Sequence, residues 1–133
     1  RIDVMEGRLR KLIALDPEHA HAYNALGYTL ADRGLRLEEA EALILRALQL
    51  MPDDPFILDS LGWVLFRRGD NEEALEHLER AYAIRADPEI AAHLGEVLWA
   101  LERHHEANAI WDDALAEHPD HRPLQDTIRR LRR

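Results

Sequence analysis

A sequence motif that repeats every 33–35 residues constrains the fold of this chain more than any other feature. The dipeptide Leu-Gly occurs three times, and its glycines Gly27, Gly62 and Gly95 lie 35 and then 33 residues apart. Alanines follow in the same order and at matching distances, at Ala40, Ala74 and Ala107 and again at Ala47, Ala81 and Ala114. A fixed period of about 20–50 residues is typical of repeat proteins. We therefore predict a stack of similar units.

Each unit has the pattern of two α-helices. In the second unit Leu58, Leu61 and Leu65 recur at helical spacing, and a second apolar stripe follows the break at Gly69-Asp70. Strands are not indicated, because the chain has only three valines and two threonines and no sustained alternation. The predicted helices span residues 3–15, 19–33, 38–50, 55–68, 71–85, 88–101, 104–117 and 121–132.

These helices predict one all-α domain, residues 1–133, with the architecture of an α-solenoid. Residues 3–15 form a half repeat, and residues 19–50, 55–85 and 88–117 form three complete repeats. Residues 121–132 form a C-terminal capping helix, because one side of the helix is apolar (Leu124, Ile128 and Leu131) and the opposite side is polar. The basic end of that helix suits the negative end of the helix dipole.

Small and capping residues indicate how each unit is built. The glycines and alanines of the repeat predict a close approach of the two helices, where larger side chains would overpack. Asp54 and Asp87 each precede a proline and are predicted N-caps, and Asp70 is predicted to cap residues 71–85 together with Glu73. Glu102 stands where the other units have glycine, so a left-handed conformation there would cost about 1 kcal/mol.

Composition excludes several classes of function. The 26 acidic and 17 basic residues give a net charge of −9, which argues against nucleic-acid binding. The chain has no cysteine for a disulfide, a thiolate nucleophile or a zinc site. It also has no transmembrane-length apolar run. Because it begins with Arg1 rather than Met, we expect a fragment or a processed chain.

Catalytic and metal sites are considered and not favoured, and no cofactor is predicted. The eight histidines include the pairs His19/His21, His104/His105 and His118/His121, whose spacing or place at helix ends does not converge on a metal. Clustered carboxylates of residues 38–41 and 72–79 fit solvated helix faces. Ser60 lies within a helix and lacks a nucleophile elbow. A hydrolase using histidine and carboxylate is kept as an alternative, which a strongly shifted histidine beside two carboxylates would favour.

The helix–turn–helix period, Leu-Gly in the first helix and two alanines seven residues apart in the second, resembles the tetratricopeptide repeat (TPR) family. This resemblance covers about residues 3–120 and implies that the α-solenoid is right-handed. It also implies a non-catalytic scaffold that binds a protein or peptide on a concave face lined by first helices. Some TPR domains hold a partner's C-terminal carboxylate with basic residues. The matching positions here include Asn24, Tyr28 and Ser60, so that mode is not expected. A structural spacer between flanking domains is the second alternative.

A narrower resemblance concerns a bacterial TPR lipoprotein family. It is carried by residues 23–33, 59–63 and 88–99. The member that this chain resembles adapts a periplasmic carboxyl-terminal processing protease to cell-wall hydrolases. The resemblance implies that the chain is the C-terminal part of such a protein, anchored at the outer membrane and facing the bacterial periplasm. Cytoplasm is the alternative location.

A groove along the first helices is the predicted binding site. Its residues are Asn24, Tyr28, Phe56, Asp59, Trp63, Phe66, Arg67, Glu96 and Trp99. Trp63 or Phe66 is the predicted anchor for the partner, because buried aromatic side chains dominate interface energetics. The aromatic stripe can instead serve packing between repeats. Separately, residues 3–15 are predicted to be the second helix of a unit whose first helix is missing, which would expose Val4, Leu9, Leu12 and Ile13. This predicts self-association through this edge at high concentration, or a missing N-terminal repeat in the native protein.

Overall fold

The computed structural model describes residues 1–132, and this part of the chain contains eight α-helices and no strand. Each helix begins and ends within one residue of the predicted range. The helices are α1 (Ile2–Leu15), α2 (Ala20–Asp32), α3 (Leu37–Leu50), α4 (Pro55–Arg67), α5 (Asn71–Ile84), α6 (Pro88–Ala100), α7 (His104–Glu117) and α8 (Arg122–Leu131).

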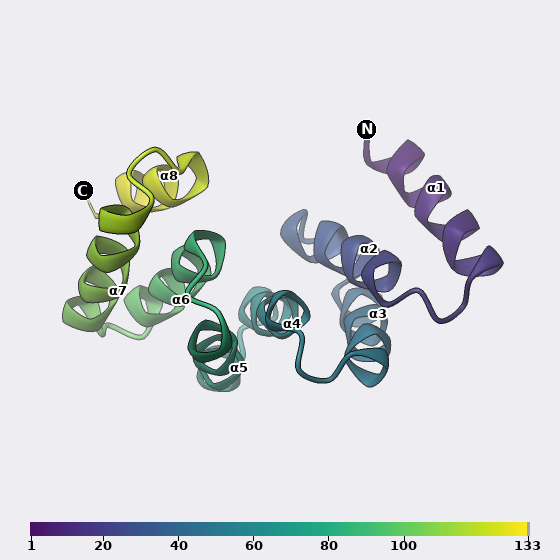
Figure 1. Cartoon of the computed structure of the whole chain (residues 1–133), viewed down its shortest axis with the longest axis horizontal. Coiled ribbons are helices and arrows are strands. Elements are labelled where there is room, and N and C mark those ends of the chain that lie inside the picture. The colour runs from purple at the N-terminus through teal and green to yellow at the C-terminus, as the bar shows by residue number, and fades with distance from the viewer. Residues whose placement is uncertain (133) are drawn as a thin grey trace.

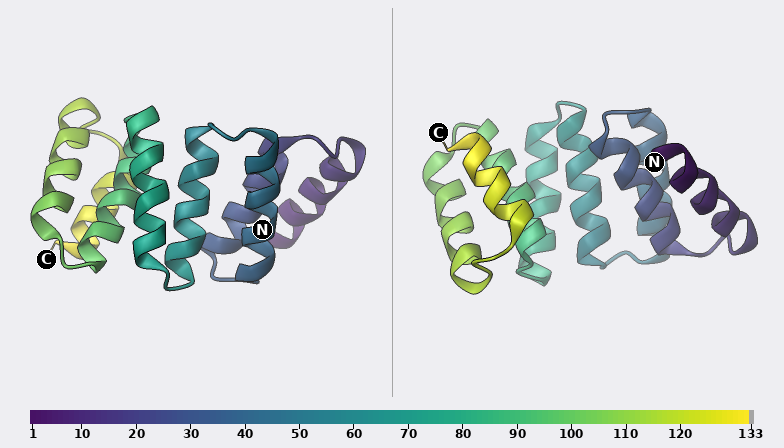
Figure 2. Two further views of the ribbon diagram at one scale, coloured as in Figure 1. Left: turned by 90° about the horizontal axis from the view of Figure 1, so that it is seen from below. Right: turned by 90° about the horizontal axis from the view of Figure 1, so that it is seen from above.

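The helices follow one another along an arc with α1 and α8 at its two ends (Figure 1). Helices α2, α4 and α6 pack against α3, α5 and α7 respectively, and each pair is a helical hairpin. The first helices lie on the inner side of the arc and the second helices on the outer side (Figure 1). Figure 2 shows from below and above that the hairpins stand side by side. The all-helical solenoid predicted from the repeat is therefore confirmed.

Glycine allows the two helices of each hairpin to approach closely. A Cβ atom on Gly62 would lie 2.6 Å from Cγ of Leu78 and 3.1 Å from the carbonyl oxygen of Ala74. A Cβ atom on Gly95 would overlap the indole ring of Trp111, which is fully buried. The six repeat alanines are also buried: Ala40, Ala47, Ala74, Ala81, Ala107 and Ala114. The predicted role of these small residues in close packing is confirmed.

The turns between paired helices use a left-handed residue. Gly34 and Gly69 have φ of 68° and 92°, and Glu102 takes the same conformation with φ of 62°. Arg36 also has a positive φ, 45°, because the first hairpin carries one additional residue before α3. The predicted strain at Glu102 thus applies in the third hairpin.

Helix capping agrees with the sequence at two of three predicted positions. The Asp54 carboxylate accepts hydrogen bonds from the backbone N–H groups of Phe56 (2.9 Å) and Ile57 (3.1 Å). Asp87 accepts one from Glu89 N–H (2.8 Å). The capping prediction for Asp70 is wrong: Asp70 occupies the N-cap position of α5, but its side chain makes no capping hydrogen bond.

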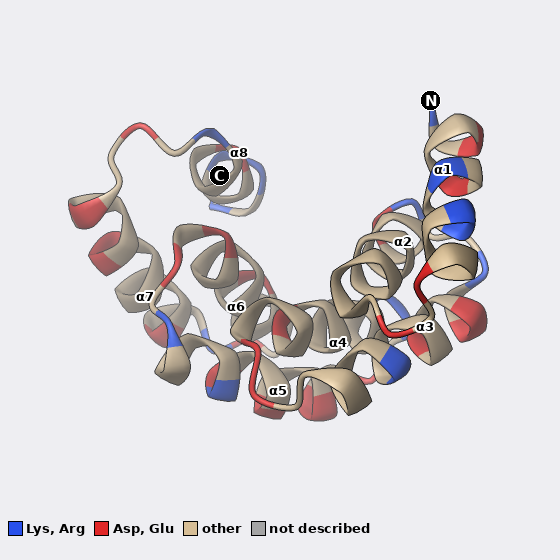
Figure 3. Cartoon of the chain, turned by 45° about the vertical axis from the view of Figure 1, so that its right-hand side comes forward, with Lys and Arg blue, Asp and Glu red and all other residues tan. Residues whose placement is uncertain are grey.

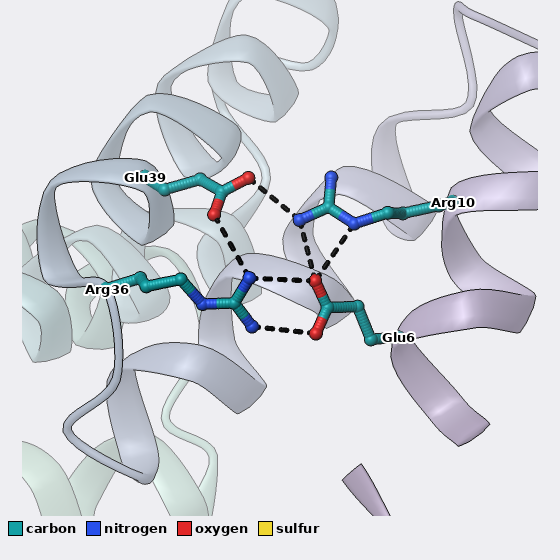
Figure 4. A network of polar contacts seen from close by, with 4 residues as sticks. All are labelled: Glu6, Arg10, Arg36 and Glu39. Atoms are coloured by element: carbon teal, nitrogen blue, oxygen red, sulfur yellow. Dashed lines mark hydrogen bonds and ion pairs between the residues drawn. The ribbon is translucent and has the colours of Figure 1, made fainter. Parts of the chain in front are cut away.

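A polar network links helix α1 to the start of α3 (Figure 4). The Glu6 carboxylate lies 2.7 Å from the guanidinium of Arg36 and 2.7 Å from that of Arg10, and Arg10 also reaches Glu39 at 2.8 Å. Arg36, followed by Arg10, lowers the pKa of Glu6 to about 2. The left-handed Arg36 therefore contributes directly to docking α1.

The apolar face of α1 is only partly covered. Leu9 and Ile13 are half-buried against the core, whereas Val4, Met5 and Leu12 are exposed and Leu15 is 85% exposed. The structure thus leaves an apolar patch on α1, and its predicted self-association stays a prediction. At the other end of the arc, α8 buries Leu124 and Ile128 against the core. None of the described helices is long and apolar enough to span a membrane.

Candidate functional site

The inner side of the arc carries a buried polar cluster that joins three first helices. His93 of α6 lies with Nδ1 2.8 Å from Oδ1 and 3.1 Å from Oδ2 of Asp59 in α4. Its other ring nitrogen, Nε2, lies 3.3 Å from the hydroxyl of Tyr28 in α2. Asp59 and Ser60 are the buried polar residues of the described chain, and Ser60 donates to the Phe56 carbonyl oxygen at 3.1 Å.

The charge state of His93 follows from this setting. Burial by itself lowers the pKa of His93, but the carboxylates of Asp59, Glu96 and Glu89 outweigh burial and raise the pKa above its ordinary value. The imidazolium form donates N–H to Asp59 from Nδ1 and to the Tyr28 oxygen from Nε2. His93 is not among the helix-end histidines considered as metal ligands. It occupies the same repeat position as Ala25 and Ser60, so no repeat signal marks it.

Trp63 packs inside this cluster. Its ring stacks on His93 with a centroid distance of 4.2 Å and lies 5.3 Å from the ring of Phe66. Its indole Nε1–H donates to Asp32 at 3.2 Å. Only 5% of Trp63 and 5% of Asp59 is exposed. Both side chains are therefore largely covered by packing between repeats, and their contact with a partner stays a prediction.

The C-terminal part of the predicted groove is also engaged within the chain. Trp99 stacks on His104 at 3.8 Å and on Trp111 at 5.6 Å, so it packs against α7. The Glu96 carboxylate lies 2.7 Å from the Arg130 guanidinium of α8. Both residues are half-buried, and their contact with a partner stays a prediction.

The remaining predicted groove residues retain accessible surface. Phe56 is 37% exposed and lies under the Arg85 guanidinium, 5.6 Å from its ring centroid, while Phe66 and Tyr28 are half-buried. Arg67 is exposed, and its guanidinium reaches the turn at Gly34. Asn24 is half-buried, and within residues 1–132 its Oδ1 atom is buried without a hydrogen-bond partner.

A cavity of about 200 Å³ opens beside the polar cluster. Its walls come from three helices, with Tyr28 from α2, a face of α6 and two residues of α8: Glu89, Ala92, His93, Pro123 and Thr127 complete the lining. Figure 3 shows the basic positions of α8 near this end of the arc. The other lining residues all lie more than 60 positions after Tyr28 in the sequence, so sequence patterns alone did not bring them together.

The chemistry of the cluster is that of a structural site. His93 beside carboxylates is the arrangement that would favour a hydrolase, but both ring nitrogens are occupied and Trp63 covers one face. Ser60 is buried and hydrogen-bonded within its own helix. Within the described residues, no three His, Asp or Glu side chains converge as metal ligands. His19 and His121 instead cap α2 and α8, accepting hydrogen bonds from Ala22 and Leu124 N–H.

Relatives by sequence share this repeat. The chain is 54% identical over 92 residues to a TPR repeat-containing protein of Pseudomonas aeruginosa. That alignment covers 69% of this chain and 16% of the relative, so the chain spans about one sixth of the relative's length.

Solved structures share the fold. A thermophilic TPR protein of Thermus thermophilus superposes with a TM-score of 0.79 and 25% identity, covering 90% of this chain and 67% of that one. An O-GlcNAc transferase mutant of Thermobaculum terrenum matches with a TM-score of 0.73 and 22% identity over 84% of this chain and 22% of that one. The second likeness shows the fold alone.

Family models place these likenesses in one family. One tetratricopeptide repeat model matches residues 18–87, and a second matches residues 65–131. Proteins of this fold are generally interaction scaffolds without catalytic activity. The chain belongs to the tetratricopeptide repeat family.

Proposed function

We propose that this chain is a non-catalytic adaptor domain that holds a segment of a partner protein against the first helices α2 and α4. The observation that carries the proposal is the aromatic surface left accessible there: Phe56 is 37% exposed, and Phe66 and Tyr28 are half-buried. Arg67 is exposed at the C-terminal end of α4. Aromatic and arginine side chains are enriched at interface hot spots.

Of the two candidate anchors for the partner, Trp63 and Phe66, we propose Phe66. Trp63 is covered by His93 and Phe66, so the accessible aromatic of that stripe is Phe66. The ring of Trp63 packs against the ring of Phe66 and holds it in place. A supported aromatic side chain loses little conformational freedom on binding, which favours a contribution to affinity.

The partner and compartment are proposed from resemblance. We place the chain as the C-terminal part of a bacterial lipoprotein adaptor, anchored at the outer membrane, that brings a periplasmic carboxyl-terminal processing protease to cell-wall hydrolases. The 54% identity to a TPR repeat-containing protein of P. aeruginosa supports the bacterial part of this proposal. A cytoplasmic scaffold is the alternative.

Two other functions make different demands on the inner surface. A spacer needs no accessible aromatic groups on α4, whereas Phe56 and Phe66 are present there. A hydrolase needs a histidine nitrogen open to substrate, whereas His93 has both nitrogens within hydrogen-bonding distance of partners. These observations favour the adaptor.

The test compares inner and outer apolar residues. Phe56→Ala and Phe66→Ala should each weaken partner binding by about 2 kcal/mol, or roughly 30-fold in Kd. Leu45→Ala on α3 is the matched control, because Leu45 is 42% exposed and lies on a second helix. Partners captured from a bacterial periplasmic extract are identified by mass spectrometry, and the affinity of each purified partner is then measured for every variant.

The outcomes separate the alternatives. Loss of affinity in the two phenylalanine variants with retention in the leucine control supports the groove. Full affinity in Phe56→Ala and Phe66→Ala, with melting temperatures unchanged, refutes it. Failure to capture any partner with the unmodified chain favours the spacer.

A further inference from the structure

The cavity between α2, α6 and α8 has the size of a single side chain. Its volume of about 200 Å³ is below the range of about 300–1,000 Å³ that is usual for small-molecule sites. Ala92 and His93 lie three and four residues after Glu89, so both neighbour it on one face of α6. Pro123 and Ala92 supply apolar wall, and Thr127 supplies a hydroxyl group.

Three carboxylates act on the Tyr28 wall of this cavity. Burial, followed by the carboxylates of Asp32, Asp59 and Glu89, raises the pKa of the Tyr28 hydroxyl. Asp59 is paired with His93, and Glu96 lies 2.7 Å from Arg130. Across residues 1–132, no cationic side chain forms an ion pair with Glu89.

The groups on the walls match one ligand chemistry. A lysine or arginine side chain places its methylene stem on apolar surface and keeps its charged head near a carboxylate. The aromatic ring of Tyr28 adds attraction for a cation. A proton on His93 would not oppose this, because the Asp59 carboxylate lies directly against the ring nitrogen at 2.8 Å.

We propose that this cavity receives a lysine or arginine side chain of the partner segment, with Glu89 as its counter-charge and Tyr28, Ala92 and Pro123 around its stem. The inference rests on the proposed function, since it assigns the chemistry of the partner that occupies the inner surface. It adds a charged specificity pocket beside the apolar contacts of Phe56 and Phe66. The partner segment is therefore basic at one position.

Other occupants fit the walls less well. A carboxylate side chain would meet Glu89 without a free cation on the lining, since the imidazolium of His93 is held by Asp59. A neutral apolar side chain would gain no attraction from Glu89, whose carboxylate is exposed and negatively charged. The experiment below tests an acidic and a neutral probe beside the cationic ones.

The experiment uses matched side-chain probes on the isotopically labelled chain. Nα-acetyl-arginine amide and Nα-acetyl-lysine amide are titrated to tens of millimolar at low salt, and backbone amide shifts are followed by NMR. Nα-acetyl-citrulline amide is the neutral match for arginine, and Nα-acetyl-glutamate amide tests the opposite charge. The pocket predicts saturable shifts at Ala92, His93 and Thr127 for the two cationic probes, weakened by added salt.

A matched pair of variants locates the counter-charge. Glu89→Gln should weaken arginine binding at least about threefold, as expected for a partly exposed charge pair. Glu72→Gln is the control, because Glu72 and Glu89 both occupy the second position of a helix and the two changes alter net charge equally. The control should bind like the unmodified chain.

Several results overturn the proposal. Equal shifts with arginine and citrulline, preference for the glutamate probe, or absence of saturable shifts at the three amides would each do so. Equal weakening by Glu89→Gln and Glu72→Gln would show a general charge effect and no site. These results leave the groove intact, because the Phe56 and Phe66 variants test partner binding outside the cavity.

Discussion

The buried pair of His93 and Asp59 should hold the second and third hairpins together, and its strength can be worked out from its contacts. A net hydrogen bond between charged groups stabilises by about 1.5–3 kcal/mol. The stack of His93 on Trp63, at 4.2 Å, adds about 0.5–1.5 kcal/mol. His93→Ala should therefore lower the free energy of unfolding by roughly 2–4 kcal/mol at about pH 6, where the histidine is charged.

A double-mutant cycle separates the two contributions. Asp59→Ala, His93→Ala and the double variant are unfolded with urea and followed by circular dichroism. The coupling free energy between the two side chains should be about 1.5–3 kcal/mol, since the cycle cancels the loss of stacking on Trp63. A second cycle on Arg103 and Glu106 is the control: their ion pair is equally short, 2.8 Å, but exposed, and its coupling should be much smaller.

The coupling should also depend on pH, with a sign fixed by the histidine. The pKa of His93 is higher in the folded chain than the ordinary value of 6.5. The contribution of the charged pair is therefore complete below about pH 6.5 and is lost as pH rises through the folded-state pKa. Coupling below about 0.5 kcal/mol at pH 6, or coupling that grows toward pH 9, would refute this account of the pair.

Four further predictions concern single positions. Gly62→Ala should lower the free energy of unfolding, because overpacking costs about 1–3 kcal/mol and exceeds the gain in helix propensity. Gly7→Ala is the control: a Cβ atom there meets open space, so the free energy of unfolding should rise by up to about 1 kcal/mol. Equal effects of the two changes in urea unfolding would contradict the packing argument. Glu102→Gly should raise the free energy of unfolding by about 1 kcal/mol by relieving the left-handed strain, and a lower melting temperature would count against it. Glu6→Gln should speed amide hydrogen exchange in α1 while α4 stays protected, since it breaks the ion pairs with two arginines; uniform exchange across both helices would show that α1 is not held by them. Val4→Glu should reduce self-association measured by sedimentation at high concentration, and a strictly monomeric unmodified chain would remove the premise.

The sequence predicted the features that recur with the repeat. Gly62 and Ala74 mark helix contacts that are the same in each hairpin, so their period alone locates the close approach. Asp54 and Asp87 act within three residues of their own position, and local chemistry is enough to predict their caps. Asp70 has the same residue type at the same kind of boundary, but its backbone angles differ and its side chain makes no capping bond.

The site depends on contacts that do not recur. His93 shares its repeat position with an alanine and a serine, and its partners Asp59 and Tyr28 come from two different hairpins. Helical spacing placed Trp63 and Phe66 on one stripe but could not tell which of them is covered, because burial depends on how far α6 approaches α4. The position of α8, which engages Glu96 through Arg130, is likewise set by tertiary packing.

The pair of Asp59 and His93 fixes the relative position of α4 and α6 more than it adds stability. Replacing a buried ion pair by apolar side chains of similar volume is often neutral, whereas removing one partner leaves the other unpaired at substantial cost. Asp59 and His93 are thus satisfied only when α4 and α6 keep the relative placement that brings them to 2.8 Å. The same His93, together with Tyr28, forms part of the wall of the adjacent cavity. Because the Asp59–His93 pair holds the cavity walls in place before binding, less conformational entropy is lost when a side chain enters the cavity. The structural pair therefore also preorganises the proposed cation pocket.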